Sequence, residues 1–180
     1  AIVGDGAQVT MEDVTIDGNI SVTDNGGGLY NNATVRGTNI TINNNESQGT
    51  ANNVDRGGGI YNTGGTIHLT DSAITNNTAD QFAGGIFNTF GGQFTLDSST
   101  TSTSRTPGSF GSVIQDNNLV IGASDGATIF NNSAMSNVTL IDVLVDGNTS
   151  PDDAGGIAHE AAAGTLTLTR TDLTNNTSAD

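Results

Sequence analysis

From Gly58 to Asp80 the chain reads GGIYNTGGTIHLTDSAITNNTAD. This stretch holds three short apolar segments, centred on Ile60, on Ile67 with Leu69, and on Ile74. Alternation of apolar and polar residues is typical of a strand with one buried face. Gly, Asn and Asp, which favour turns, separate the segments. The stretch therefore predicts three short strands joined by tight turns.

The same unit recurs along the whole chain. Its last segment is an aliphatic residue followed three positions later by asparagine, found at Ile16–Asn19, Ile42–Asn45, Ile74–Asn77, Ile114–Asn117, Val145–Asn148 and Leu173–Asn176. Successive asparagines of this motif are 26, 32, 40, 31 and 28 residues apart. Repeats of this length indicate a stacked architecture in which each unit contacts its neighbours. We expect one all-β domain over residues 1–180, a parallel β-helix of about six coils with three strands per coil. The expected coils begin near residues 1, 28, 59, 85, 128 and 156.

Stacking these coils predicts three interior rows of apolar side chains. The first contains Ile2, Leu29, Ile60, Ile86, Ile129 and Ile157, and the second contains Val9, Val35, Ile67, Phe94, Val138 and Leu166. The aliphatic residues of the recurring asparagine motif form the third. The fourth coil carries an insertion at about residues 97–112, which is interpreted either as a contact loop with Arg105 as its anchor or as a tolerated surface excursion.

The recurring asparagines have a structural interpretation. Asn tolerates left-handed backbone geometry at corners, and stacked amides can hydrogen-bond from coil to coil as a ladder. We expect such a ladder at Asn19, Asn45, Asn77, Asn117, Asn148 and Asn176. Ten Asn-x-Ser/Thr sequons also make the chain a possible glycoprotein, although asparagines inside a ladder are not open to modification.

Composition excludes several classes of partner. The net charge is −15, with four Arg and no Lys, so nucleic acid is not an expected partner. No apolar run reaches the roughly 18 residues that span a bilayer. The sequence starts with Ala-Ile-Val and lacks a basic leader, which favours a secreted, processed chain at the cell surface.

Paired Gly followed by an aliphatic residue, with a later hydrophobic-x-x-Asn, resembles the repeats of chlamydial polymorphic outer-membrane proteins. It is also similar to bacterial and archaeal surface proteins of the right-handed β-helix, or pectate-lyase-like, superfamily. The best copy of the pattern is Gly58–Asp80. The resemblance implies a right-handed coil and an extracellular setting, but no particular activity, because this fold hosts many functions.

No catalytic residues are expected. Carbohydrate-active members of that superfamily need basic residues and carboxylates grouped on one face, whereas the arginines here are scattered. The nearest approach to a carboxylate–imidazole site is Asp152–Asp153 with His159, at a coil corner. His68 alternates outward between Ile67 and Leu69 and is interpreted as a solvated surface residue.

A calcium site is a weaker expectation. Aspartates recur two to four residues before the glycine column, at Asp24, Asp55, Asp80, Asp125 and Asp153. Stacked carboxylates repel one another, and calcium, with six to eight oxygen ligands, relieves that repulsion. Because the spacing drifts, solvated corner aspartates are the favoured interpretation, and no cofactor is expected.

The ends predict self-association. Uncapped solenoid ends present unpaired strand edges and an apolar cross-section. We therefore expect an extracellular filament that polymerises head to tail, with its interface at Ala1, Ile2, Val3, Val9, Leu166, Leu168, Leu173, Asn176 and Asp180. The alternatives are an adhesin or passenger-domain segment that binds a glycan or a host protein, and, third, an enzyme acting on polysaccharide.

Overall fold

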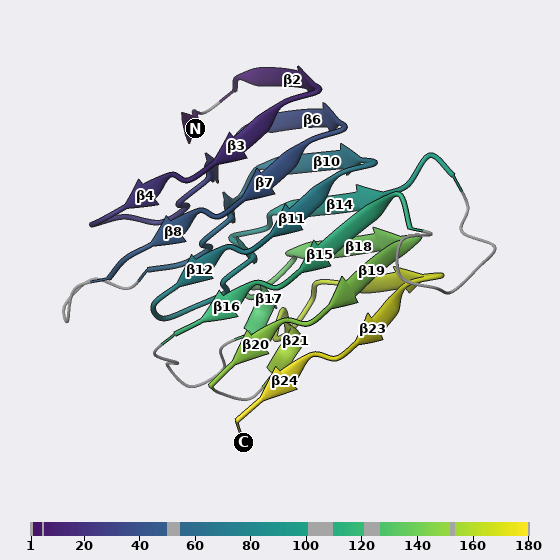
Figure 1. Cartoon of the computed structure of the whole chain (residues 1–180). Coiled ribbons are helices and arrows are strands. Elements are labelled where there is room, and N and C mark those ends of the chain that lie inside the picture. The colour runs from purple at the N-terminus through teal and green to yellow at the C-terminus, as the bar shows by residue number, and fades with distance from the viewer. Residues whose placement is uncertain are drawn as a thin grey trace.

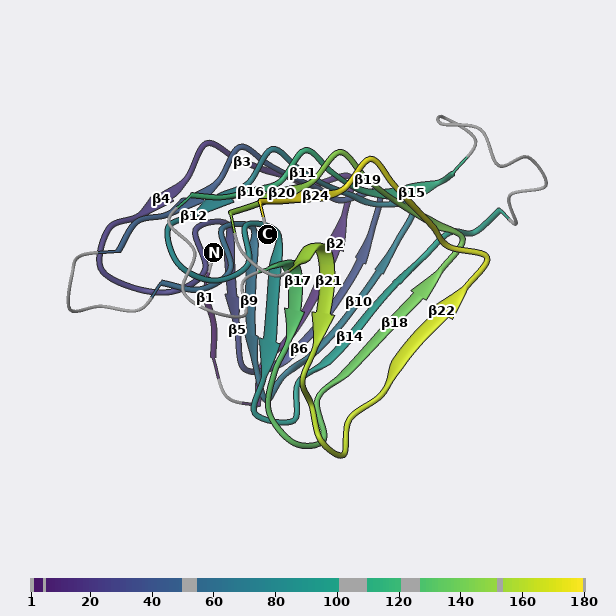
Figure 2. The same ribbon diagram turned by 90° about the horizontal axis from the view of Figure 1, so that it is seen from below.

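The computed structural model describes residues 2–4, 6–49, 55–100, 110–120, 127–151 and 154–179. Every regular element in this part of the chain is a strand, and the strands wind into a parallel β-solenoid (Figure 1). The prediction of an all-β parallel β-helix is confirmed. Five full turns separate β1 from β21 in the first sheet, after which the chain continues through β22, β23 and β24. Seen along the stack, successive coils lie over one another (Figure 2).

The solenoid has four parallel sheets of six strands each. Sheet A comprises β1 (Ile2–Val3), β5 (Leu29–Asn31), β9 (Ile60–Thr63), β13 (Ile86–Thr89), β17 (Ala127–Asn131) and β21 (Ala154–His159). Sheet B comprises β2 (Gln8–Glu12), β6 (Thr34–Thr38), β10 (Thr66–Thr70), β14 (Gln93–Asp97), β18 (Asn137–Ile141) and β22 (Leu166–Thr169). Sheet C comprises β3 (Thr15–Asp17), β7 (Thr41–Asn43), β11 (Ala73–Thr75), β15 (Ser112–Gln115), β19 (Val143–Asp146) and β23 (Asp172–Thr174). Sheet D comprises β4 (Ile20–Ser21), β8 (Glu46–Ser47), β12 (Thr78–Ala79), β16 (Asn118–Leu119), β20 (Thr149–Ser150) and β24 (Thr177–Ser178).

Sheet D is a difference from the predicted three strands per coil. Its strands are two residues long, too short for the alternation of apolar and polar residues that identified the other three. Each of these short strands pairs with the sheet D strand of the adjacent coil. In β12 and β8, for example, Thr78 lies opposite Glu46 and Ala79 lies opposite Ser47. Each coil therefore consists of three longer strands and one short fourth strand.

The interior rows have the predicted register, with one exception. Ile67 lies opposite Val35 on one side and Phe94 on the other, and these side chains are fully or almost fully buried. The exception is Ile2, which pairs with Tyr30 and not with Leu29. Strand β1 has only two residues, and the turn that follows it varies in length from coil to coil, so spacing in the sequence does not fix its register.

A second apolar cluster lies outside sheet A. It is formed by Tyr61, Ala83, Phe87 and Phe130, with Tyr30, Phe82 and Ala158 packed against it. The aromatic rings follow one another from coil to coil, with centroids 5.3 Å apart for Tyr30 and Tyr61 and 5.7 Å apart for Tyr61 and Phe87. The outer face of this sheet is therefore also covered, which explains why its strands read as apolar on both sides.

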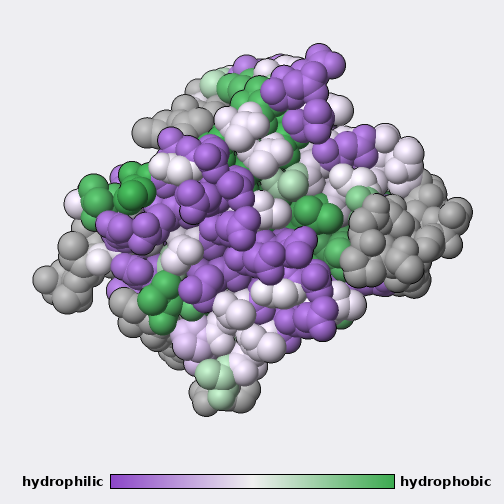
Figure 3. Space-filling model, viewed as in Figure 1, coloured by the Kyte–Doolittle hydropathy of each residue, from purple (hydrophilic) through white to green (hydrophobic). Residues whose placement is uncertain are grey.

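The outer faces of sheets C and D, which face the viewer in Figure 3, are mainly hydrophilic with separated apolar patches. In the described part of the chain, no helix is long and apolar enough to cross a membrane. Residues 101–109 of the predicted insertion, including Arg105, lie outside the described residues. Its flanks are described, and Phe110 is buried at one of them.

Candidate functional site

The expected asparagines form a continuous hydrogen-bonded ladder at the corner between sheets C and D. In its centre, the backbone N–H and the side-chain amide of Asn45 both donate to Oδ1 of Asn77, each over 3.0 Å. The amide of Asn77 also donates back to the carbonyl of Ile42 at 3.0 Å. Both asparagines are buried. Each amide thus satisfies buried backbone groups of the adjacent coil, which is a structural role.

Left-handed corner geometry belongs to the residue before each ladder asparagine. Asn44 and Asn76 have φ values of 54° and 53°, and Gly18 and Gly147 have 66° and 63°. Asn and Gly are the residues that adopt this backbone conformation most readily. The two reasons given for asparagine, left-handed geometry and the amide ladder, therefore apply to two adjacent positions. The first position has the left-handed backbone, and the second is buried in the ladder.

The ladder has a direction. At its start, the N–H and amide of Asn19 donate to Oδ1 of Asn45 over 3.1 and 2.8 Å. At its end, Oδ1 of Asn176 accepts the corresponding bonds from Asn148 over 3.2 and 2.7 Å, and its amide donates to the carbonyl of Val145 at 2.9 Å. At the first coil the ladder therefore ends in the amide oxygen of Asn19, and at the last coil it ends in the backbone N–H of Asn176.

The end coils leave parts of the interior rows open. Leu168 and Leu173 are 42% and 46% exposed, whereas Leu140 and Val145, one coil earlier in the same rows, are fully buried. Val9 and Leu166 are half-buried and pack against the core. Strand β1, which contains Ile2 and Val3, pairs with β5, while Ala1 and Asp180 lie outside the described residues.

One corner column places an acid and a base at opposite ends of the rod. Asp13, Asn39, Asp71, Asp142 and Arg170 follow sheet B in the first, second, third, fifth and sixth coils, and all have left-handed φ values. In the last step of this column, Nε and Nη2 of Arg170 donate to the two carboxylate oxygens of Asp142 over 2.8 and 2.7 Å. The Asp142 side chain is only 2% exposed, and the guanidinium caps it from the open end.

Three of the five candidate calcium aspartates lie in the described residues, in successive coils after sheet D. Asp24 is exposed, Asp55 is fully buried and Asp80 is half-buried. Burial raises the pKa of the Asp55 carboxyl above its ordinary value of 3.8, the charges of Asp80 and Asp24 raise it further, and Arg56 opposes them. Burial and then Glu46 raise the pKa of Asp80. Asp125 and Asp153 lie outside the described residues.

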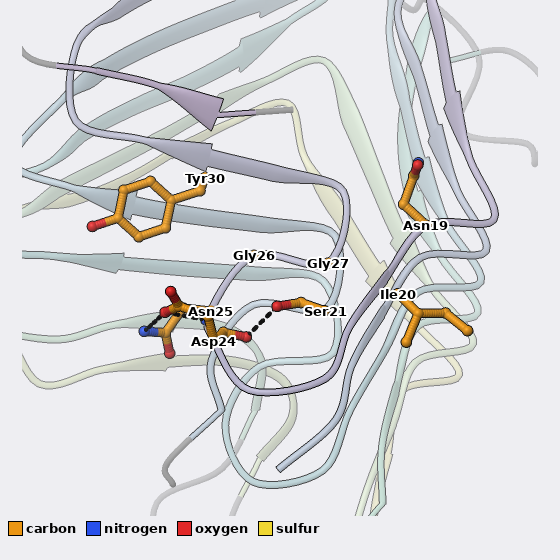
Figure 4. Close-up of a pocket in the computed structure, with 8 residues that line it drawn as sticks. All are labelled: Asn19, Ile20, Ser21, Asp24, Asn25, Gly26, Gly27 and Tyr30. Atoms are coloured by element: carbon orange, nitrogen blue, oxygen red, sulfur yellow. Dashed lines mark hydrogen bonds between the residues drawn. The ribbon is translucent and has the colours of Figure 1, made fainter.

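A cavity of about 430 Å³ adjoins this corner at the first coil (Figure 4). Asp24, Asn25 and Tyr30 line it, together with Ser21 of β4. The carbonyl of Asp24 accepts hydrogen bonds from the hydroxyls of Ser21 at 2.7 Å and Ser47 at 3.1 Å. These bonds fix the turn that carries Asp24 and Asn25 against two coils.

His68 and His159 each have a hydrogen-bonding partner. His68 is not simply solvated, because its Nε2 lies 2.8 Å from Oδ2 of Asp97 on the next coil. His159 accepts a hydrogen bond at Nδ1 from the amide of Asn131 over 2.8 Å, and Asp152 and Asp153 lie outside the described residues. Among the residues that the structure describes, no three His, Cys, Asp or Glu side chains lie close enough together to hold one metal ion between them.

A second ladder was missed in the sequence. Amides donate from coil to coil along sheet A, each over 2.8 Å, through Asn31, Asn62, Asn88 and Asn131 to His159. The signal was present, because each asparagine follows the first-row aliphatic residue by two positions. Two stacked amide columns therefore brace the solenoid at different corners.

Comparisons with known proteins add no family. No family model matches the chain, and neither the curated proteins nor the solved structures gave a match. The described residues define the class of protein as a parallel β-solenoid.

Proposed function

We propose that the chain is a structural subunit of an extracellular filament that grows by head-to-tail stacking of its end coils. The observation that supports this most directly is the complementarity of the two ladder ends. In a stacked pair, Asn176 of one copy donates through its backbone N–H to the amide oxygen of Asn19 in a second copy, and the amide of Asn19 donates to the carbonyl of Leu173. This continues the bonding pattern of the five internal steps.

The apolar rows and the corner column support the same contact. Leu168 lies in the interior row that begins with Met11, so stacking covers Leu168 with Met11 of the second copy. Arg170 ends the column that begins with Asp13, so its guanidinium pairs with Asp13 of the second copy while still bound to Asp142. Head-to-tail contacts that do not close into a ring produce filaments, and stacking along the axis of the coils does not close.

The experiment is negative-stain electron microscopy and light scattering of the purified 180-residue chain over a range of concentrations. We expect uniform fibres with an axial repeat of about 29 Å, six strand spacings. Monomers that persist at high concentration would overturn the proposal.

Extracellular localisation and membership of the right-handed, pectate-lyase-like superfamily belong to the same proposal. They rest on the repeat pattern and on the acidic, lysine-free composition. Secretion tests of the full-length gene product check the first. An experimental structure of this chain, compared with members of that superfamily for the hand and geometry of its coils, checks the second.

An adhesive module is the second candidate, favoured by one cavity. Arg56, Phe82, Phe90 and Asn132 contribute to a hollow of about 200 Å³ beside the outer aromatic cluster. Phe90 is 70% exposed at a left-handed turn, an arrangement suited to stacking on a sugar ring. Glycan-array binding by the parent chain, lost in Phe90→Asn, supports this candidate; no binding to any glycan excludes it in favour of the filament.

A further inference from the structure

Three buried oxygen atoms at one corner of the solenoid have no hydrogen-bond donor among the described residues. They are both carboxylate oxygens of Asp55 and Oδ1 of Asn25. The N–H of Gly26 donates to the carbonyl of Arg56 over 3.0 Å, and Leu29 pairs with Ile60, so adjacent coils place Asn25 opposite Arg56 and one position along from Asp55. Buried oxygens without a donor are costly, and a proton or a cation removes that cost.

The neighbouring arginine does not neutralise Asp55 by direct contact. The guanidinium of Arg56 lies over the rings of Phe82 and Phe87, 5.6 and 5.4 Å from their centroids. The next coil adds a further carboxylate nearby, since the N–H of Phe82 donates to the carbonyl of Asp55 over 3.1 Å and Asp80 precedes Phe82 by two residues. A net charge of −15 also raises the local concentration of cations at such a site.

We propose that this acidic corner binds one divalent cation of the calcium class, with Asp55 and Asn25 as its buried ligands and Asp24 and Asp80 as flanking carboxylates. Calcium accepts six to eight oxygens from carboxylates, side-chain amides, backbone carbonyls and water. It therefore does not need three carboxylates around one point. Bound here, the cation joins successive coils of a single copy and offsets the repulsion between their aspartates.

The structure provides its own reporter for the test. Tyr30 lines the same cavity as Asp24 and Asn25, and the chain has no Trp. Terbium, a luminescent substitute for calcium, emits when a nearby tyrosine is excited. The titration uses the whole chain, diluted until light scattering reports monomers, at constant ionic strength. Because it is made on monomers, its outcome does not depend on whether the chain polymerises.

We expect saturable terbium emission that calcium displaces. Asp55→Asn should weaken binding by about tenfold or more, as removal of a ligand does at least as much as removal of its supporting groups. Asp116→Asn, an exposed aspartate at a different corner, is the matched control and should bind like the parent. Tyr30→Phe should dim the emission and leave calcium competition unchanged.

Two outcomes would overturn the site: emission that rises linearly without saturation, or equal binding by the parent and Asp55→Asn. Either result would mean that terbium binds only diffusely to the acidic surface. Circular dichroism checks the fold of each variant. If Asp55→Asn does not fold, Asp24→Asn, at an exposed position of the same corner, must show the weakened binding, and unchanged affinity in that variant would equally reject the proposal.

Discussion

Asn19 and Asn176 lie at opposite ends of one hydrogen-bonded row and present opposite halves of the same bond. Asn19 donates to the coil that follows it, and Asn176 accepts from the coil that precedes it. The open amide oxygen and the open backbone N–H are therefore complementary across a junction between two copies. Because the row is buried within the rod, this junction would be shielded from water as the internal steps are.

The first prediction tests that junction with charge. Leu168→Glu places a carboxylate on the open end of the apolar core, where stacking would bury it without a partner, so fibres should be lost. Thr167→Glu is the matched control, since Thr167 is exposed on the outward side of the same strand. Both variants are compared with the parent by light scattering at equal concentration.

A reciprocal pair sharpens this result. Asp13→Arg removes the acid expected to meet Arg170 and should prevent assembly. A mixture with chains carrying Arg170→Asp pairs opposite charges at both kinds of mixed junction and should recover fibres in which the two variants alternate. Assembly of Asp13→Arg alone at the rate of the parent would contradict the proposed contact.

The second prediction concerns the ladder. Asn77→Ala removes the acceptor that the backbone N–H and the side-chain amide of Asn45 share, and one donor to the carbonyl of Ile42, all at buried positions. We expect the free energy of unfolding to fall by roughly 2–4 kcal/mol. Asn76→Gly is the control, because Gly accepts the left-handed backbone there and the side chain is exposed; it should cost about 1 kcal/mol or less. Urea denaturation measures both, and equal losses would deny the ladder its stabilising role.

The third prediction concerns the glycine pairs. A Cβ on Gly58 would collide with the carbonyl oxygens of Thr78 and Gly84, and neither backbone atom can move without breaking the stacking. Gly58→Ala should therefore destabilise the chain by about 2 kcal/mol or more. Gly4→Ala, where no atom lies within 4 Å of the added Cβ, should change stability by about 0.5 kcal/mol at most. Thermal unfolding of the two variants tells them apart.

Sequence patterns predicted the longer strands and one ladder because these features repeat side by side in a fixed register. Ile42, Ile74 and Ile114 recur with their asparagines, and each pairs with its counterpart as aligned. Sheet D was missed because two residues carry no periodicity. The pairing of Ile2 was misjudged because one short strand beside a variable turn does not fix its register.

The candidate site was only partly predictable for a different reason. The aspartate column could be read from spacing, but burial separates its members: Asp24 is exposed, whereas Asp55 has no solvent contact. The next coil lies against Asp55, since the N–H of Phe82 donates to its carbonyl over 3.1 Å and Phe82 packs against Phe87 and Phe130. Long-range packing of this kind leaves no local pattern in the sequence.

The last prediction follows from the pKa of Asp55, which burial and then Asp80 and Asp24 raise above 3.8. The folded state therefore holds this proton more tightly than the unfolded state. Well below pH 3.8 both states are protonated, and Asp55 then adds no buried charge to the folded state. As the pH rises through the higher pKa of the folded state, the parent loses stability. In a chelator, Asp55→Asn should thus be more stable than the parent at pH 7, and the difference should shrink toward pH 3.5. Urea denaturation at both pH values measures this difference; a gap that stays constant with pH would show that the Asp55 carboxyl does not bear the cost of its burial.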